Sequence, residues 1–115
     1  MDEQKISGTL LRLYMHENDQ HEGRLLWDTI MRHANKEGIS GCSVFKAIAG
    51  FGSHHSIHKG PMPFELHGVQ TVRMDFLVTD AESIQLIDWS RRQGLRLFYT
   101  TTPAGFGTIN AQEVA

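Results

Sequence analysis

Apolar and polar residues alternate along two segments of this chain, residues 9–16 and 71–79. Alternation with a period of two is typical of a β-strand that buries one of its faces. Two further short runs, residues 42–49 and 95–101, are also rich in β-branched, aromatic and other apolar residues. The pattern therefore predicts four strands over these four segments.

A helical period follows the first predicted strand. Apolar residues recur there three and four positions apart, as expected for a helix that packs one face on a core. These residues are Leu26, Trp27, Ile30, Met31 and Ala34. Asp19 and Glu22 have the spacing of a capping box, and Gly38 is a typical C-terminal stop. We therefore expect a helix that ends at about Glu37.

A second helix is expected over residues 80–92. Asp80 is a suitable N-cap residue, and a helix here would bury Ile84 and Ile87, which lie three positions apart. The resulting order of elements is β-α-β-β-α-β. This order predicts an α+β, ferredoxin-like fold, in which one antiparallel four-stranded sheet carries both helices on one face.

The length of 115 residues is that of a single domain, residues 1–115. We expect a domain core over about residues 8–101 and a C-terminal tail over residues 102–115. Residues 51–70 lack any period and are rich in glycine and proline. Because long connections without secondary structure are uncommon in compact domains, we expect this one to be functional.

The sheet face opposite the helices carries an unusual mixture of side chains. It combines apolar and aromatic groups with charges of both signs, namely Leu10, Tyr14, Leu77, Phe98, Arg12, Arg73, Asp75 and Arg96. Such a mixture suits a protein interface, so we expect a homo-oligomer. The alternative is a solvated face on which long side chains cover the apolar groups.

Composition excludes several classes of function. The net charge of −2 lacks the basic footprint of a nucleic-acid-binding protein. The apolar runs are too short to span a bilayer, and the polar, acidic N-terminus is unlike a signal peptide. Cys42 is the single cysteine, so no intrachain disulfide can form. We therefore expect a cytoplasmic protein and interpret Cys42 as a small buried thiol rather than a nucleophile.

Candidate chemistry gathers after the second predicted strand. Gly50 and Gly52 flank Phe51, and backbone N–H groups around paired glycines can hold an anion. Lys46 would add a positive charge if it lies on the same side. The alternative is that the glycines only turn the chain and that Lys46 is solvated.

Three histidines follow within five positions, in the pattern H-H-x-x-H at His54, His55 and His58. If the segment is helical, His54 and His58 lie on one face and could share a divalent metal. The glutamate of a zinc-protease motif is absent, and no nucleophile, base and acid are spaced as a catalytic set. We therefore expect a binding protein rather than an enzyme.

Four segments together resemble an uncharacterised PII-like family, the domain of unknown function 190, which is related to the nitrogen regulatory PII signalling proteins. The segments are GTLLRLY at 8–14, EGRLLW at 22–27, GCSVFKAIAGFG at 41–52 and IH at 57–58. The resemblance implies a homotrimer that senses small molecules in clefts between subunits, beneath a mobile loop over about residues 51–70. It also favours a role for His58 in ligand contact or loop conformation.

Two positions depart from the pattern of these families. PII proteins hold nucleotide phosphates with a glycine- and lysine-rich loop before the last strand, where this chain has Arg91, Arg92 and Gly94. Lys46 stands where the family usually has arginine, and lysine cannot grip an anion with two parallel hydrogen bonds.

The leading hypothesis is a regulatory protein that binds a small anionic metabolite or an adenine nucleotide and signals to a transporter or an enzyme. Its ligand residues would be Lys46, Gly50, Phe51, Gly52, His58, Arg91 and Arg92. The alternative hypothesis is a ferredoxin-like trimer that binds a divalent metal through the loop histidines.

Overall fold

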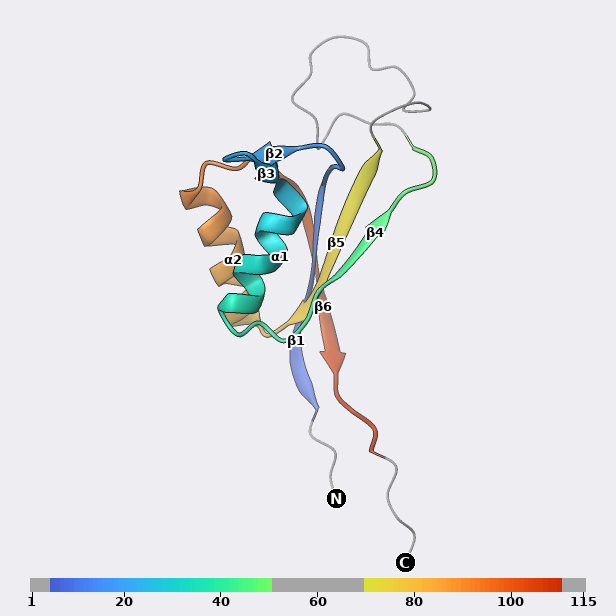
Figure 1. Ribbon diagram of the computed structural model, residues 1–115. Coiled ribbons are helices and arrows are strands. Elements are labelled where there is room, and N and C mark those ends of the chain that lie inside the picture. Colours follow the sequence, from blue (N-terminus) through green and yellow to red (C-terminus); the bar gives the residue numbers. More distant parts are fainter. Residues whose placement is uncertain (1–4, 51–69, 111–115) are drawn as a thin grey trace, which may run out of the picture.

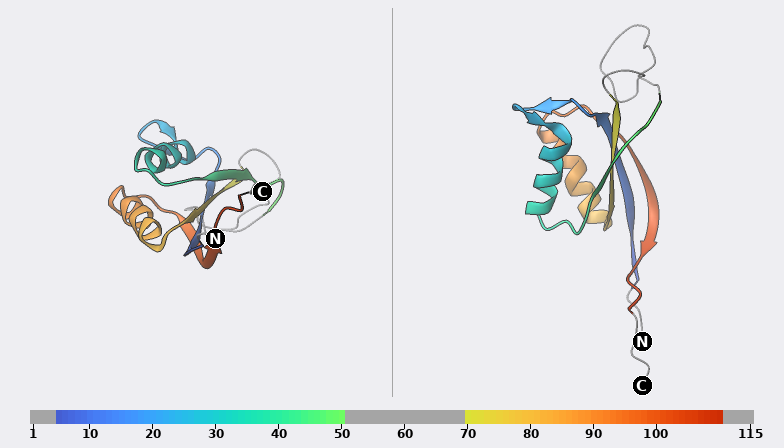
Figure 2. Two further views of the ribbon diagram at one scale, coloured as in Figure 1. Left: turned by 90° about the horizontal axis from the view of Figure 1, so that it is seen from below. Right: turned by 45° about the vertical axis from the view of Figure 1, so that its right-hand side comes forward.

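The computed structural model describes residues 5–50 and 70–110 of the chain. Within these residues the main sheet has four antiparallel strands in the spatial order β4-β5-β1-β6. The strands are β1 (Ile6–His16), β4 (Ser43–Lys46), β5 (Thr71–Val78) and β6 (Phe98–Phe106). Two helices, α1 (Leu26–Lys36) and α2 (Asp80–Arg92), cover one face of the sheet (Figure 1, Figure 2). The α+β, ferredoxin-like fold expected from the sequence is thereby confirmed.

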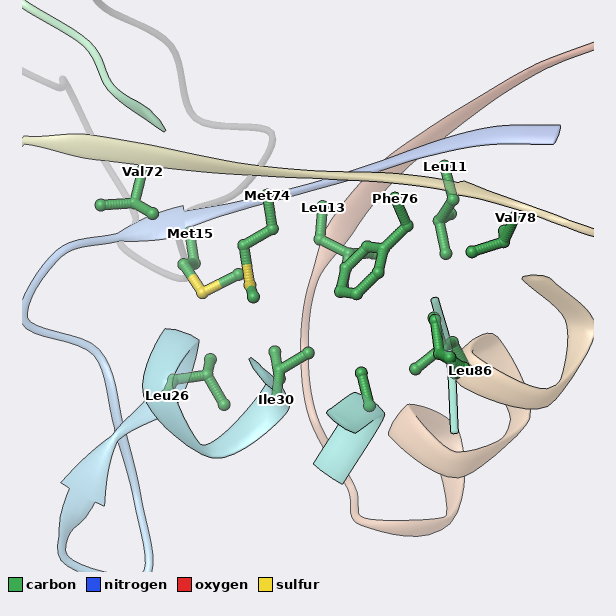
Figure 3. Close-up of a cluster of buried hydrophobic side chains, with 12 residues drawn as sticks. Leu11, Leu13, Met15, Leu26, Ile30, Val72, Met74, Phe76, Val78 and Leu86 are labelled. Carbon is green, nitrogen blue, oxygen red and sulfur yellow. The ribbon is translucent and has the colours of Figure 1, made fainter. Parts of the chain in front are cut away.

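The hydrophobic core lies between the helices and the two central strands (Figure 3). The register places Leu11 opposite Phe76 and Leu13 opposite Met74, so the apolar residues of β1 and β5 face the helices together. Leu26 and Ile30 of α1 and Leu86 of α2 complete this core. The period-two pattern of the two central strands is therefore the main determinant of which face of the sheet is buried.

The helices are short, and both are followed by a glycine in the left-handed conformation. Gly38 has φ 81° and Gly94 has φ 74°, and their N–H groups donate to the carbonyls of Asn35 and Arg91 at 3.2 and 3.0 Å. Gly38 as the expected helix stop is thus confirmed. In the part of the chain that the structure describes, no helix is long and apolar enough to cross a membrane.

A small hairpin occupies the place where the sequence predicted a capping box. Strands β2 (Gln20–His21) and β3 (Arg24–Leu25) pair across Glu22 and Gly23, which have φ 53° and 81°. The Asp19 carboxylate accepts a hydrogen bond from the backbone N–H of His16, and α1 begins after Leu25 without a side-chain cap. The capping box of Asp19 and Glu22 was therefore wrong, because this carboxylate closes the turn after β1 instead.

The N-terminus of α2 is capped one residue earlier than expected. Thr79 and Glu82 form a reciprocal capping box, in which the Thr79 hydroxyl accepts from the N–H of Glu82 at 3.1 Å. Asp80 instead accepts a hydrogen bond of 2.6 Å from the Thr9 hydroxyl. The predicted burial of Ile84 was also wrong. Leu86 is buried, whereas the Ile84 side chain is 65% exposed.

The two outer strands differ most from the prediction. β4 ends at Lys46 instead of continuing to residue 49, and β6 runs from Phe98 to Phe106 instead of over residues 95–101. Among the described residues, Ile6, Ser7 and Gly8 of β1 pair with β6 alone, and Ile6 lies opposite Phe106. Residues 102–106 therefore belong to the sheet rather than to a tail.

The close approach of three strands at Gly8 gives a test of the fold. A Cβ added at Gly8 would overlap the Val78 carbonyl oxygen and lie 2.9 Å from the Phe106 ring, whereas at Gly105 its nearest neighbour is the flexible Lys5 side chain at 3.2 Å. We expect Gly8→Ala to lower the free energy of unfolding by about 1–3 kcal/mol. Gly105→Ala should leave it nearly unchanged. Urea denaturation measures both, and equal effects would contradict this packing.

Candidate functional site

The structure describes four of the seven residues expected to bind ligand: Lys46, Gly50, Arg91 and Arg92. Phe51, Gly52 and His58 lie outside the described residues, as do the candidate metal ligands His54 and His55. Among the described residues, no group of three histidine, cysteine, aspartate or glutamate side chains is placed to hold a metal. The histidine-metal hypothesis thus stays untested.

Lys46 is held at the end of β4 by an ion pair. Its Nζ atom lies 2.9 Å from Oε1 of Glu17, the residue that follows β1. The Glu17 N–H donates to the carbonyl of Gln70 at 2.8 Å, and the Ala47 N–H donates to the carbonyl of Thr71 at 2.9 Å. Glu17 therefore contacts Lys46 through its side chain and Gln70, the residue before β5, through its backbone. Any anion that binds Lys46 has to compete with this carboxylate.

Among the described residues, Gly50 lines a very small cavity. Its volume is about 10 Å³, and it is enclosed by Ala47, Ala49, Gly50, Gln70 and Thr71. A cavity of this size holds at most one water molecule. Within the described residues, Gly50 therefore borders no space that is large enough for a metabolite.

Arg91 and Arg92 share one carboxylate at the end of α2. Their Nη1 atoms lie 3.5 and 3.7 Å from the oxygens of Asp88, and the two side chains are largely exposed. Arg91 also lines a cavity of about 170 Å³ beside β6, whereas Arg92 does not. The structure thereby distinguishes the two arginines as candidate ligand-binding residues, because Arg91 lines this cavity and Arg92 does not.

The expected cationic residues do not meet within one chain. Lys46 is the last residue of β4, and Arg91 lines a cavity together with Tyr99 of β6. Strands β4 and β6 are the two opposite edges of the sheet (Figure 1). Both edge strands have an unpaired side among the described residues. A site that uses both cations would therefore need two copies of the chain.

The outer sheet face has the composition expected from the sequence. Asp75, whose side chain is 18% exposed, lies 2.8 Å from Nε of Arg73 and 3.4 Å from Nε of Arg12. The Arg73 guanidinium also lies 4.8 Å from the centre of the Phe45 ring, close enough for a cation–π contact. The order of the strands thus places one carboxylate, two guanidinium groups and one aromatic ring next to each other on this face.

Apolar groups surround this charge cluster. The rings of Tyr14 and Phe98 are 5.5 Å apart, and Leu77, which pairs with Leu10, is 42% exposed. Of the residues assigned to this face, Arg96 alone falls outside a strand, because β6 begins at Phe98. The sequence located this surface correctly but did not reveal the ion pairs of Asp75.

One further cavity was not predicted from the sequence. It has a volume of about 410 Å³ between α1 and the segment that leads to β4. It is lined by Asp28, Met31, Arg32, Ala34, Asn35, Ile39, Ser40, Gly41 and Cys42. Asp28 accepts a 2.9 Å hydrogen bond from Nε of Arg32 in the next turn. The spacing of this pair was the only signal in the sequence, and it is common on solvated helices.

The chemistry of Cys42 agrees with its interpretation as a structural thiol. Burial, and secondarily the negative charge of Asp75, raises the pKa of the Cys42 thiol to about 11. A thiol with this pKa is almost entirely protonated at neutral pH and is therefore a poor nucleophile.

An aromatic stack joins the two helices. The rings of His33 on α1 and Trp89 on α2 are parallel to within 9°, with centroids 3.9 Å apart. Desolvation is the largest effect on His33 and lowers the pKa of its imidazole below 6.5. Lys36 and Arg92 lower this pKa further, while Glu37 opposes them. Burial therefore favours neutral His33.

The fold and this arrangement of residues define a ferredoxin-like α+β protein with an open, partly apolar sheet face. A family model described as DUF190, uncharacterized ACR, COG1993, matches residues 8–85, and the chain belongs to this family. A UPF0166 protein of Aquifex aeolicus is 30% identical over 80 residues, which cover 70% of this chain and 74% of that protein. A UPF0166 protein of Methanocaldococcus jannaschii is 43% identical over 47 residues, which cover 41% of this chain and 44% of that protein.

The stack of His33 on Trp89 predicts a dependence of stability on pH. Because the folded pKa of His33 lies below 6.5, its contribution is fully present above pH 6.5 and is lost as the pH falls toward the folded value. His33→Phe keeps an aromatic ring but cannot titrate. Between about pH 8 and about pH 5, the wild type should lose more unfolding free energy than this variant in urea denaturation. Identical losses would show that His33 is not coupled to folding.

Proposed function

We propose that this chain is a PII-like regulatory protein that forms a homotrimer and binds a small anionic metabolite or a nucleotide in clefts between its subunits. The observation that carries the proposal is the separation of Lys46 and Arg91 at opposite edges of the sheet. In a closed ring of copies, the β4 edge of one subunit faces the β6 edge of the next. The two cations then meet at one cleft, and an anion between them balances their charges.

The outer sheet face supports the oligomeric part of the proposal. Its charge cluster of Arg12, Arg73 and Asp75 holds two guanidinium groups and one carboxylate within ion-pair distance, so burial of the face leaves Asp75 with two charged partners. Leu77 adds an apolar group that is 42% exposed in the single chain. A mixed surface of this kind is typical of interfaces between subunits.

The ion pair of Lys46 and Glu17 offers a way to transmit binding. An anion that takes the place of Glu17 on Lys46 releases this carboxylate, whose own backbone N–H is bonded to Gln70. Replacement of Glu17 by a ligand at Lys46 thus affects Lys46, which precedes residues 51–69, and Gln70, which follows them. We propose that this segment carries the signal to a partner protein such as a transporter or an enzyme, without a catalytic step.

The proposed assembly predicts a sharp difference between two exposed aliphatic residues. Leu77→Glu places a charge on the outer sheet face and should convert the trimer into a monomer. Ile84→Glu is the matched control, because Ile84 is 65% exposed on α2 and belongs to the helix layer. Sedimentation velocity should give three times the chain mass of 13.0 kDa for the wild type and for the control. A monomeric wild type at micromolar concentration would contradict the shared cleft.

Ligand binding should respond in opposite directions to the two partners of the ion pair. With ATP, AMP and inorganic phosphate as probes, we expect Lys46→Ala to weaken binding about tenfold through the loss of one charged hydrogen bond. Glu17→Gln should strengthen binding by up to about fivefold, because it removes the competing carboxylate. Thermal shift and calorimetric titration measure both changes, with Lys36→Ala as the control for a lost surface charge.

Divalent metals, as a third class of probe, distinguish the proposed anion-binding protein from the alternative metal-binding trimer. Divalent metals are screened in the same thermal-shift experiment as the nucleotides. Stabilisation by metals alone, with none by ATP, AMP or phosphate, would favour the metal-binding trimer and overturn the anion site. Binding of these anions that is unaffected by both Lys46→Ala and Glu17→Gln would also contradict the proposed site.

A further inference from the structure

The cavity beside β6 has a lining with a clear division between apolar and polar groups. Its volume is about 170 Å³. It is lined by Leu13, Ile87, Ser90, Arg91, Leu95, Leu97 and Tyr99. Four of these residues are aliphatic, and the other three carry a hydroxyl, a guanidinium and a phenol. We propose that this cavity binds a short aliphatic monocarboxylate, with the carboxylate at Arg91 and the hydrocarbon chain among the leucines and Ile87.

The fold brings these groups together from three elements. Ser90 and Arg91 are neighbours in the last turn of α2, and Leu95 and Leu97 belong to the segment that connects α2 to β6. Tyr99 pairs with Leu13 of β1, so it shares the helix-covered side of the sheet with the core. The apolar part of the cavity therefore continues the hydrophobic core, and its polar part lies at the end of the helix.

The charges at the polar end of the cavity favour an anionic ligand. Asp88 is the carboxylate that pairs with Arg91 and Arg92, at 3.5 and 3.7 Å, so one negative charge faces two positive ones. A guanidinium has five N–H donors, and a carboxylate can accept two of them in parallel. An incoming carboxylate therefore completes the pairing of Arg91 without displacing Asp88. The hydroxyls of Ser90 and Tyr99 are further donors within the same lining.

Size and polarity narrow the class of ligand. A volume of about 170 Å³ corresponds to about six water molecules at roughly 30 Å³ each. This space suits a chain of about four to six carbons and is too small to enclose a nucleotide. The aliphatic lining disfavours a second charged group at the far end of the ligand, because burying an unpaired charge is costly. A monocarboxylate is thus favoured over a dicarboxylate.

The inference rests on the proposed function only in treating Arg91 as a ligand-binding residue, and it deepens that function by naming a ligand class. The cavity lies within one chain, so its occupation does not require Lys46 of a neighbouring copy. Binding of a monocarboxylate can therefore be tested separately from binding of nucleotide or phosphate.

The test is an NMR titration of the whole chain with 3-methylbutanoate, and with the neutral 3-methylbutanamide as the matched ligand. We expect saturable shifts of the amide signals of Leu95, Leu97 and Tyr99, with a dissociation constant of about 1 mM or tighter. Arg91→Ala should weaken carboxylate binding about tenfold. Arg92→Ala is the matched control, since Arg92 shares Asp88 but does not line the cavity, and it should change binding less than about twofold.

Each of three results would overturn the inference: no saturable shift at these residues, equal binding of acid and amide, or equal effects of the two arginine variants. The same samples are titrated with ATP and phosphate. If these anions bind through Lys46 while 3-methylbutanoate does not bind, the ligand class is wrong and the proposed function stands. If 3-methylbutanoate binds through Arg91 while Lys46→Ala has no effect on any anion, the inference stands and the shared cleft fails.

Discussion

Strand β1 is the element on which the rest of the structure depends. It pairs with β5 along one edge and with β6 along the other, and its inward residues Leu11, Leu13 and Met15 provide the surface on which the helices pack. A shift of its register by one residue would move this apolar row to the open face and bring Arg12 into the core. The correct fold therefore requires that β1 forms hydrogen bonds along both of its edges and at the same time turns its apolar residues toward the helices.

The central half of the fold could be predicted from the sequence because local pattern and tertiary environment agree there. Residues 9–16 lie in β1 and residues 71–78 form β5, and in both segments one face is apolar and the other is mixed. The outer strands were misplaced because their limits depend on partners that are distant in sequence. β6 continues to Phe106, which pairs with Ile6, and no local signal in the chain predicts this distant pairing.

The candidate site was predictable in its residue types but not in its connections. Lys46 was identified as a cation, yet its partner Glu17 lies on the turn after β1 and becomes a neighbour only through the sheet. Similarly, the sequence alone does not show which of the adjacent residues Arg91 and Arg92 faces a cavity. Helix geometry gives only Arg91 a place in the cavity beside β6. Long-range geometry, rather than residue chemistry, was the information that the sequence lacked.

The pairing of Ile6 with Phe106 has a consequence for how the chain can be rearranged. This pair joins the beginning of the first strand to the end of the last one, while His16 and Thr71 pair at the other end of β1. A short peptide could therefore link Ile6 to Phe106 directly, and new termini could be opened between Gly50 and Gln70 with every strand that the structure describes intact. The order of the elements along the chain is thus separable from the architecture that they form.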